Sequence, residues 1–348
     1  MDRQETILEQ VRKALEARTP LAIHGGNTKA FYGGPSNGTV LDLSGHQGVV
    51  DYDPGELVVT CRAGSKLEEI RALLSENGQH LPFEPPAFGD AATIGGTVAC
   101  GFSGPRRPWA GSLRDYLLGV KIINGRGDVL RFGGQVMKNV AGYDVSRLMA
   151  GAMGTLGVLL EVSFKVLPQT ARELTLSFAC EQEEAIRRIA GWSAKPLPLS
   201  AASWRDNYLM VRLSGAASET EKAGDAMKPD VLSEETGHWQ RLREQQDGFF
   251  TADGPTWRIS VPAATPPLEL KGSCLLDWGG AQRWYTGSEP ADRIRAVAEA
   301  AGGYATLFRG EADAPRFQPL SPAMAQLHHR VRQAFDPHGL FNPGRMGH

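Results

Sequence analysis

The 348-residue sequence has few residues that could bind a metal or a cluster through thiolates. Its four cysteines, Cys61, Cys100, Cys180 and Cys274, are far apart and form no C-x-x-C pair. This spacing argues against a zinc ribbon or an iron–sulfur cluster held by this chain. Reduced thiols in a cytosolic protein are the simplest interpretation.

Strong charge of one sign and long apolar runs are also absent. The formal net charge is −2 and basic and acidic residues are mixed, so we expect neither a nucleic-acid-binding surface nor a polybasic membrane patch. The longest uncharged stretch, Leu148 to Leu160, contains three glycines and is shorter than the roughly 20 apolar residues of a membrane span. Residues 1–20 predict a charged amphipathic helix and no signal sequence. We therefore expect a soluble chain without a transmembrane segment.

Glycine, by contrast, is plentiful at 41 residues, which favours a loop-rich ligand-binding protein over a helical bundle. The length exceeds what one small core needs, and it suits two domains or one large domain with an insertion. The residue composition changes after Pro168, where proline-rich breaks appear and no dense glycine motif occurs. This change predicts a second domain with its own core.

One glycine-rich stretch runs from Pro85 to Gly104, carries almost no charge and includes the pair Gly95-Gly96. The pair lies between β-branched residues that favour extended backbone, so we predict a strand or turn edge with bare backbone amides. Such a backbone can approach a flat or phosphorylated ligand closely and bind anions. The alternative is a bulged strand or tight turn in an ordinary core.

A second glycine pair follows a short predicted strand at residues 21–23, in the run His24-Gly25-Gly26-Asn27-Thr28-Lys29. Its backbone N–H groups could wrap a pyrophosphate, with Lys29 adding one positive charge. The spacing is that of neither a P-loop nor G-x-G-x-x-G. A hairpin turn is the alternative interpretation.

Periodicity and turn residues predict the remaining elements. Ser65 is expected to cap a helix, with Glu68 completing a capping box, and residues 111–115 are expected to open a strand. The expected helices are 6–18, 65–77, 181–190, 291–301 and 321–335. The expected strands are 39–43, 49–52, 56–63, 117–124, 129–132, 159–166, 174–179, 208–213 and 257–261.

Five segments in a fixed order then suggest a family. They are H-G-G-N-T-K, A-T-I-G-G-T-V-A-C-G-F-S-G, K-N-V-A-G-Y-D, G-T-L-G-V and, near the C-terminus, D-P-H-G-L-F-N-P-G-R. Together they resemble the FAD-binding flavoproteins of the vanillyl-alcohol oxidase and p-cresol methylhydroxylase type. Within that superfamily the chain most closely resembles the FAD-binding subunits of bacterial glycolate oxidase, which are relatives of the D-lactate and D-2-hydroxyglutarate dehydrogenases. The likeness covers roughly residues 20–168 and about the last twenty.

The resemblance implies an α+β fold with a two-part FAD domain and a smaller cap. The FAD-binding domain, residues 1–168, would consist of two α/β subdomains with the cofactor between them. Residues 169–320 would form a cap domain with an antiparallel sheet. Residues 321–348 would form a C-terminal helix and tail that return to the FAD domain.

The resemblance also implies which residues contact FAD. The pyrophosphate would be held by the first glycine segment, the flavin and ribityl chain by the second, the adenine end by the fourth and the flavin ring by the C-terminal one. In that order the residues are Gly25, Gly26, Asn27, Thr28 and Lys29; Thr93, Ile94, Gly95, Gly96, Thr97, Val98, Gly101, Ser103 and Gly104; Gly157 and Val158; and Asn342.

Two departures from the family pattern bear on the cofactor. Many relatives carry Asn at or near the position of Gly101, so the contact there is open. Covalent attachment in some members needs a His after the first glycine pair, where this chain has Asn27-Thr28, and His24 is interpreted as a strand-end residue. We therefore predict non-covalent FAD.

The substrate chemistry is less well represented in the sequence. Oxidation of a 2-hydroxy acid needs a base for the hydroxyl proton, a cation for the carboxylate and a hydride acceptor. Related single-chain enzymes carry G-E-H-G-D-G, whereas residues 309–313 here read R-G-E-A-D, without a histidine. The adjacent pair His328-His329 points in two directions on a helix, so we expect no metal site. Arg258 and Arg309 could clamp a carboxylate, although scattered arginines are more often surface residues; no catalytic residue is assigned.

The working hypothesis is a chain that binds FAD inside a larger complex acting on a small 2-hydroxy acid, glycolate. The resemblance implies a second flavoprotein subunit that oxidises glycolate and an iron–sulfur subunit that accepts electrons. It further implies a cytoplasmic location, or one peripheral to the inner membrane through the complex. A stand-alone hydroxy-acid dehydrogenase and a flavin-free scaffold subunit remain the alternatives, and a Rossmann protein is disfavoured because no strand leads into G-x-G-x-x-G.

Overall fold

The computed structural model describes residues 1–134, 144–233, 237–251 and 253–347. Their contacts divide the chain into two compact units. Unit 1 comprises Met1–Ser103, Ser112–Gln169 and Pro319–His348, and unit 2 comprises Gly104–Gly111 and Thr170–Gln318. Residues 104–111, which were expected in the first domain, therefore group with the second unit.

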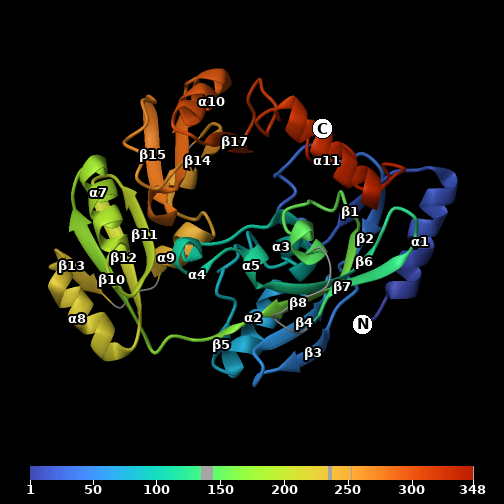
Figure 1. The fold of residues 1–348 in the computed structure, drawn as a ribbon, viewed down its shortest axis with the longest axis horizontal. Coiled ribbons are helices and arrows are strands. Elements are labelled where there is room, and N and C mark those ends of the chain that lie inside the picture. The colour runs from blue at the N-terminus through green and yellow to red at the C-terminus, as the bar shows by residue number, and fades with distance from the viewer. Residues whose placement is uncertain (135–143, 234–236, 252, 348) are drawn as a thin grey trace. The chain divides into compact units, whose positions relative to one another are not determined.

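Unit 1 combines a five-stranded sheet and two small two-stranded sheets, β1-β2 and β5-β9, with surrounding helices (Figure 1). In chain order its main elements are α1 (Gln4–Ala17), β1 (Leu21–His24), β2 (Thr39–Asp42), β3 (Val49–Asp53), β4 (Val58–Arg62), α2 (Leu67–Glu76), β5 (Gln79–His80), α3 (Ile94–Cys100), α5 (Leu113–Tyr116), β6 (Leu117–Ile123), β7 (Val129–Gly133), α6 (Val145–Met149), β8 (Val158–Lys165), β9 (Leu167–Pro168) and α11 (Pro322–Phe335). The larger sheet has the order β3-β4-β8-β6-β7 and is antiparallel throughout, whereas β1 and β2 pair in parallel.

Unit 1 has two main hydrophobic clusters, and the larger sheet contributes residues to both. Alternate residues of the larger sheet, such as Val120 and Val162, point to one face and pack against α2 and α3, as expected from the two-residue period of a strand. The apolar stripe of α1, which includes Ile7 and Val11, packs in a separate cluster with Leu41 of β2.

Three local predictions in unit 1 were wrong. Ser65 does not cap α2, because its hydroxyl is bonded to the backbone of Gly48, and the N-cap residue Lys66 makes no side-chain cap bond. Residues 94–100 form the helix α3 and not an extended edge. Residues 113–116 form the short helix α5, which starts from a capping box between Ser112 and Asp115, and not the opening of a strand. In each case side-chain hydrogen bonds or tertiary packing outweighed residue propensity.

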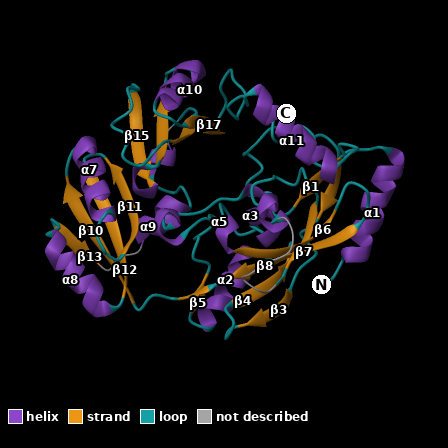
Figure 2. Ribbon diagram, in the orientation of Figure 1, coloured by secondary structure: helices purple, strands orange, loops and turns teal. Residues whose placement is uncertain are grey.

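Unit 2 is built on one eight-stranded antiparallel sheet, and its strands are drawn in orange in Figure 2. Its elements are α4 (Arg107–Ala110), β10 (Arg172–Ala179), α7 (Gln182–Ser193), β11 (Leu199–Arg205), β12 (Tyr208–Gly215), α8 (Ala217–Met227), β13 (Val231–Ser233), α9 (Gly237–Arg243), β14 (Thr256–Ser260), β15 (Gly272–Asp277), β16 (Gln282–Gly287), α10 (Ala291–Ala300) and β17 (Tyr304–Arg309), with short 3-10 turns at Gly248–Thr251 and Trp278–Gly280. The strand order is β13-β10-β12-β11-β15-β16-β14-β17. The predicted antiparallel sheet after residue 168 is confirmed.

One face of this sheet packs against helices. Leu176 and Val211 form a cluster with Ile186 of α7 and Ala223 of α8, and Trp257 forms another with Ile294 of α10. The sequence did not predict β11, β13, β15, β16, β17, α8 or α9, because polar and small residues interrupt their patterns. In the part of the chain that the structure describes, no helix is long and apolar enough to cross a membrane.

Candidate functional site

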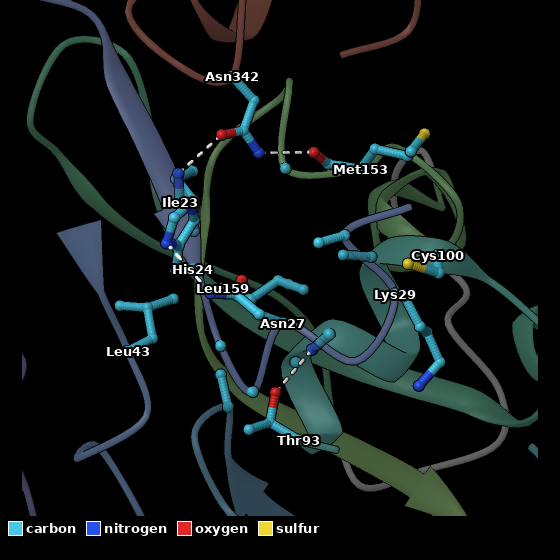
Figure 3. Close-up of a pocket in the computed structure, with 18 of the residues that line it drawn as sticks. Ile23, His24, Asn27, Lys29, Leu43, Thr93, Cys100, Met153, Leu159 and Asn342 are labelled. Atoms are coloured by element: carbon cyan, nitrogen blue, oxygen red, sulfur yellow. Dashed lines mark hydrogen bonds between the residues drawn. The ribbon is translucent and has the colours of Figure 1, made fainter. Parts of the chain in front are cut away.

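Unit 1 contains a cleft of about 910 Å³, counting the space open to solvent at its mouth. Segments from the start, the middle and the end of the chain meet around it (Figure 3). Its lining consists of Ile23, His24, Gly25, Gly26, Asn27, Thr28, Lys29, Ala30, Ser36, Leu43, Ala63, Thr93, Gly95, Gly96, Ala99, Cys100, Met153, Gly154, Gly157, Leu159, Asn342 and Arg345. The first, second and fourth glycine segments and the C-terminal segment thus converge on one site.

The glycine loop, residues 25–30, forms one wall of the cleft. Its position is possible only because Gly25 and Gly26 have no side chains. A Cβ atom at Gly25 would lie 2.5 Å from Thr93 Oγ1, and one at Gly26 would overlap the carbonyl oxygen of Ala91. Asn27 follows with φ of 54°, a left-handed conformation that Asn tolerates well. The loop can therefore approach the 91–93 segment backbone to backbone, which only glycine allows.

The helix α3 forms the adjoining wall. Thr93 is its N-cap, and its Oγ1 accepts a hydrogen bond of 3.2 Å from Gly96 N. Gly95 N donates to Ala63 O at 2.7 Å, and a Cβ at Gly95 would lie 2.7 Å from Ala63 Cβ. The glycine pair thus serves to bring a helix, rather than a strand, close to the β4 end of the larger sheet.

Helical geometry explains which of the predicted residues reach the cleft. Thr93, Gly95 and Gly96 line it together with Ala99 and Cys100, on one face of α3. The remaining predicted residues of this segment do not line the cleft. Ile94, Thr97 and Val98 are buried in the core, and Gly101 is the left-handed C-cap of α3. The Ser103 hydroxyl accepts a hydrogen bond from Leu113 N, and Gly104 belongs to unit 2. A strand would have divided these residues differently, since its side chains alternate.

At the far side of the cleft, Gly157 lines the wall while Val158 does not, since its side chain is fully buried in the cluster that contains α1. Met153 and Gly154 precede Gly157 on the same wall. Met153 adopts φ of 52°, which is unfavourable for a residue with a side chain. Three non-glycine residues with positive φ, Asn27, Met153 and Asn342, thus line this one cleft among the described residues.

Asn342 joins two walls of the cleft. Its Oδ1 accepts from Ile23 N at 2.7 Å, and its Nδ2 donates to Met153 O at 2.7 Å (Figure 3). The side chain is 5% exposed. Its role in the structure is to fix β1 against the 153–157 segment.

The charges in the cleft are positive. Lys29 and Arg345 line it, and no aspartate or glutamate does so among the described residues. Lys29 Nζ donates to Ala87 O at 3.0 Å and lies over the Phe88 ring. Burial raises the pKa of the Cys100 thiol, whereas the charges of Lys29 and Arg345 act in the opposite direction. The cleft therefore suits an anionic ligand.

Several lining residues were not predicted. His24, the last residue of β1 as expected, faces the cleft with its Nδ1 3.4 Å from Asn27 Nδ2. Cys100 lies inside the second glycine segment, Met153 directly precedes the fourth, and Arg345 ends the quoted N-P-G-R run. The only sequence feature that could have predicted these lining residues is their position within or next to the glycine-rich segments. Of the K-N-V-A-G-Y-D segment, residues 138–143 lie outside the described residues.

The other candidates do not line this cleft in the part of the chain that the structure describes. Within the described ranges, no three His, Cys, Asp or Glu side chains are grouped so that they could hold a metal ion. Glu311 and Asp313 are exposed. Arg258 and Arg309 both lie over the ring of Phe308, at 5.5 and 5.8 Å from its centroid, and Arg309 Nε donates to Gln245. Desolvation lowers the pKa of Arg309.

The site has the features that a dinucleotide flavin requires. The glycine loop supplies backbone that can approach a diphosphate closely, and the N-terminal turn of α3 supplies a second side-chain-free wall. No carboxylate among the described lining residues opposes an anion. Residues 2–133 match the family model described as "FAD binding domain". The fold and the site thus define a protein with an FAD-binding domain.

Comparison with curated proteins identifies the family. Over 345 residues, the chain is 48% identical to the glycolate oxidase subunit GlcE of Escherichia coli (strain K12), covering 99% of this chain and 97% of that protein. The chain belongs to the GlcE family of glycolate oxidase subunits.

More distant relatives share only about half of the chain. The glycolate oxidase subunit GlcD of Bacillus subtilis (strain 168) is 34% identical over 173 residues, which are 49% of this chain and 36% of that protein. The mitochondrial D-lactate dehydrogenase [cytochrome] of Arabidopsis thaliana is 28% identical over 191 residues, 54% of this chain and 33% of the relative.

The similarity to solved structures extends over both units. A structure of alkyldihydroxyacetonephosphate synthase superposes with a TM-score of 0.68 at 13% identity, covering 97% of this chain and 75% of that one. At this identity the similarity shows the fold alone. It confirms the predicted α+β class with an antiparallel-sheet domain, and the matched family model shows the FAD-binding domain.

Proposed function

We propose that this chain is the FAD-carrying subunit of a glycolate oxidase complex and that it takes part in electron transfer from a small 2-hydroxy acid. The observation that carries the proposal is the convergence of the glycine loop, α3, Gly157 and Asn342 on one positively charged cleft. Membership of the GlcE family supports the same function.

The residues that line the cleft have separable tasks in this proposal. The glycine loop and Lys29 hold the diphosphate, Thr93, Gly95 and Gly96 lie along the flavin and ribityl part, and Gly157 lies at the adenine end. Bound FAD supplies a two-electron acceptor. Asn342 acts near the flavin ring by fixing the two walls, since both polar atoms of its side chain already bond to backbone. Unit 1 is then the FAD domain, and most of unit 2 is the cap.

The cofactor is non-covalent in this proposal. The two residues after the first glycine pair are Asn27 and Thr28, and the Thr28 hydroxyl donates to Ala87 O at 2.8 Å. No histidine occupies either position. Acid precipitation of the purified protein should leave free FAD in the supernatant, whereas flavin that stays with the pellet would contradict this point.

Oxidation of the hydroxy acid itself is assigned to the complex and not to this chain alone. The region that corresponds to G-E-H-G-D-G has no histidine, and its two carboxylates, Glu311 and Asp313, are exposed. We propose that a second flavoprotein subunit oxidises glycolate and that an iron–sulfur subunit accepts the electrons. The complex would be cytoplasmic, or peripheral to the inner membrane.

The visible absorbance spectrum of the purified chain, before and after addition of glycolate or D-lactate, tests this function. We expect an oxidised flavin spectrum that is not bleached by the substrate until the other subunits are added. Rapid bleaching of the isolated chain, with full turnover to a dye acceptor, would favour a stand-alone dehydrogenase. A colourless protein that fails to take up added FAD would favour a scaffold subunit.

A further inference from the structure

The C-terminal tail, which we define as Leu340–Met346, runs along the edge of β1. Leu21 N donates to Leu340 O at 2.7 Å, and Asn342 N donates back to Leu21 O at 2.9 Å. A parallel bridge joins Leu21 and Phe341. Because β1 leads directly into the glycine loop, this pairing brings the end of the tail to the mouth of that loop.

Arg345 holds the glycine loop through backbone carbonyl groups. Its Nη1 donates to Ala30 O at 3.1 Å and to Gly34 O at 3.0 Å, and its Nη2 donates to Lys29 O at 3.3 Å. A guanidinium group presents its N–H donors in a rigid planar fork. One side chain thus fixes three peptide groups at and after the end of the loop.

The tail also meets the segment just after the loop, backbone to backbone. Gly34 N donates to Arg345 O at 2.9 Å. A Cβ atom at Gly33, where φ is 89°, would lie 2.7 Å from the same oxygen. These contacts leave no room for side chains, so the tail constrains the path of the chain immediately after the loop.

Arg345 also contributes charge to the cleft. It lines the cleft with Lys29, and its charge and that of Lys29 both act on the Cys100 thiol inside it. The described lining residues include no carboxylate that would neutralise this charge locally. A guanidinium that orders a loop and faces an open cleft is suited to an anionic ligand at that loop.

We infer that Arg345 is a positioning residue for a diphosphate bound at the glycine loop, and that the C-terminal tail thereby sets the affinity for the cofactor. The inference rests on the proposed function in that FAD is the physiological source of the diphosphate. It also predicts that ADP, which carries a diphosphate without flavin, binds at the same place.

The test compares R345Q and R345K with the wild type and with R330Q, which removes one exposed arginine from α11. Binding of FAD and of ADP is titrated separately by calorimetry on protein stripped of flavin, and each protein is first shown to be folded by circular dichroism. We expect R345Q to bind both ligands at least about tenfold more weakly, R345K to lie between R345Q and the wild type, and R330Q to match the wild type.

Each outcome bears on the inference. Equal FAD and ADP affinities in R345Q and the wild type would overturn it, even if R345Q melts at a lower temperature, because the role would then be structural only. If R345Q does not fold, R345K decides, and unchanged ligand affinity in R345K would overturn the positioning role. A wild type that binds ADP but not FAD would overturn the proposed function while ADP binding still tests Arg345. A wild type that binds neither would overturn both.

Discussion

Asn342 Oδ1 accepts a hydrogen bond from the backbone N–H of Ile23, although 319 positions separate the two residues in the chain. The same amide donates through Nδ2 to Met153 O. One side chain therefore ties the first strand and a middle segment of unit 1 to the C-terminal tail. Both partners border the cleft, so its width depends on this amide.

Replacing Asn342 should destabilise unit 1 and weaken cofactor binding. In N342A the half-buried Ile23 N–H and the buried Met153 carbonyl lose their partner. A buried unsatisfied group costs about 1–3 kcal/mol, and the cost at Ile23 should lie at the low end of this range. In N342D the Ile23 bond is kept, but a carboxylate oxygen faces the Met153 carbonyl, so we expect a loss of similar size. Thermal unfolding and FAD titration measure both effects.

The matched control for Asn342 is N77A. Asn77 Nδ2 donates to Leu73 O at an exposed position, where water can replace the lost bond, and the change should cost less than about 0.5 kcal/mol. If N342A were as stable as N77A, the bridging role of Asn342 would be wrong.

Substitution of Gly26 by alanine should abolish FAD binding. The added Cβ would overlap Ala91 O, so the loop must move away from the 91–93 segment. G191A is the opposite case, since a Cβ at Gly191 in α7 meets nothing within 4 Å, and it should stabilise the helix by about 0.5–1 kcal/mol. Flavin content and melting temperature are the measurements, and G26A with normal flavin content would contradict the assignment of this loop.

The role of Thr93 as the N-cap residue of α3 can be tested by removing its hydroxyl group. T93V removes the hydroxyl that accepts from Gly96 N and should destabilise α3 by about 1 kcal/mol, whereas T93S keeps the acceptor and should restore most of the loss. Thr93 Oγ1 also packs against Gly25, where an added Cβ would lie only 2.5 Å away. Replacing the hydroxyl therefore also changes the contact between α3 and the glycine loop at the wall of the cleft. FAD affinity should therefore fall in T93V and recover in T93S, and identical behaviour of the two variants would exclude a role for the hydroxyl.

His238 of α9 should make unit 2 sensitive to acid. Burial, and secondarily the charges of Arg241, Arg212 and Arg205, lower its pKa from the ordinary 6.5 to about 4, while its Nε2 lies 3.0 Å from Ser203 Oγ. Between pH 6.5 and about 4 the unfolded chain binds a proton at this residue and the folded chain does not. The contribution of His238 to the free energy of unfolding should therefore fall as the pH is lowered through this window, and this contribution should change no further below about pH 4.

H238Q removes this titration and keeps a hydrogen-bonding side chain, so its stability should depend less on pH between 4 and 6.5 than that of the wild type. Chemical denaturation at pH 4.5, 5.5 and 7 is the measurement. H329Q, at an exposed position of α11, is the control and should follow the wild type. A parallel pH dependence in H238Q and the wild type would show that His238 is not responsible.

Much of the fold could be predicted because local patterns are strong where one face of an element is buried. The stripe of α1, the hairpin β6–β7 and the buried strand β8 follow directly from apolar periodicity and turn residues. Strands such as β11, with its run of Ser and Ala, were missed because small residues carry no such period. In the same way, Ser65 fits a capping box in sequence, yet its hydroxyl bonds Gly48, a long-range partner that no local pattern reveals.

The sequence by itself determined where backbone without side chains would occur, because glycine positions are visible in the sequence, and the family resemblance predicted that these distant segments converge. They do line one cleft. Only the tertiary structure decided which of those residues face the cleft. The packing of α3 against Ala63 turned an expected strand into a helix, and a helix presents Gly95, Gly96, Ala99 and Cys100 on one side and hides Ile94 and Val98 on the other. Tertiary structure likewise brought Arg345 to the glycine loop, since hydrogen bonds between residues more than 300 positions apart leave no local signature.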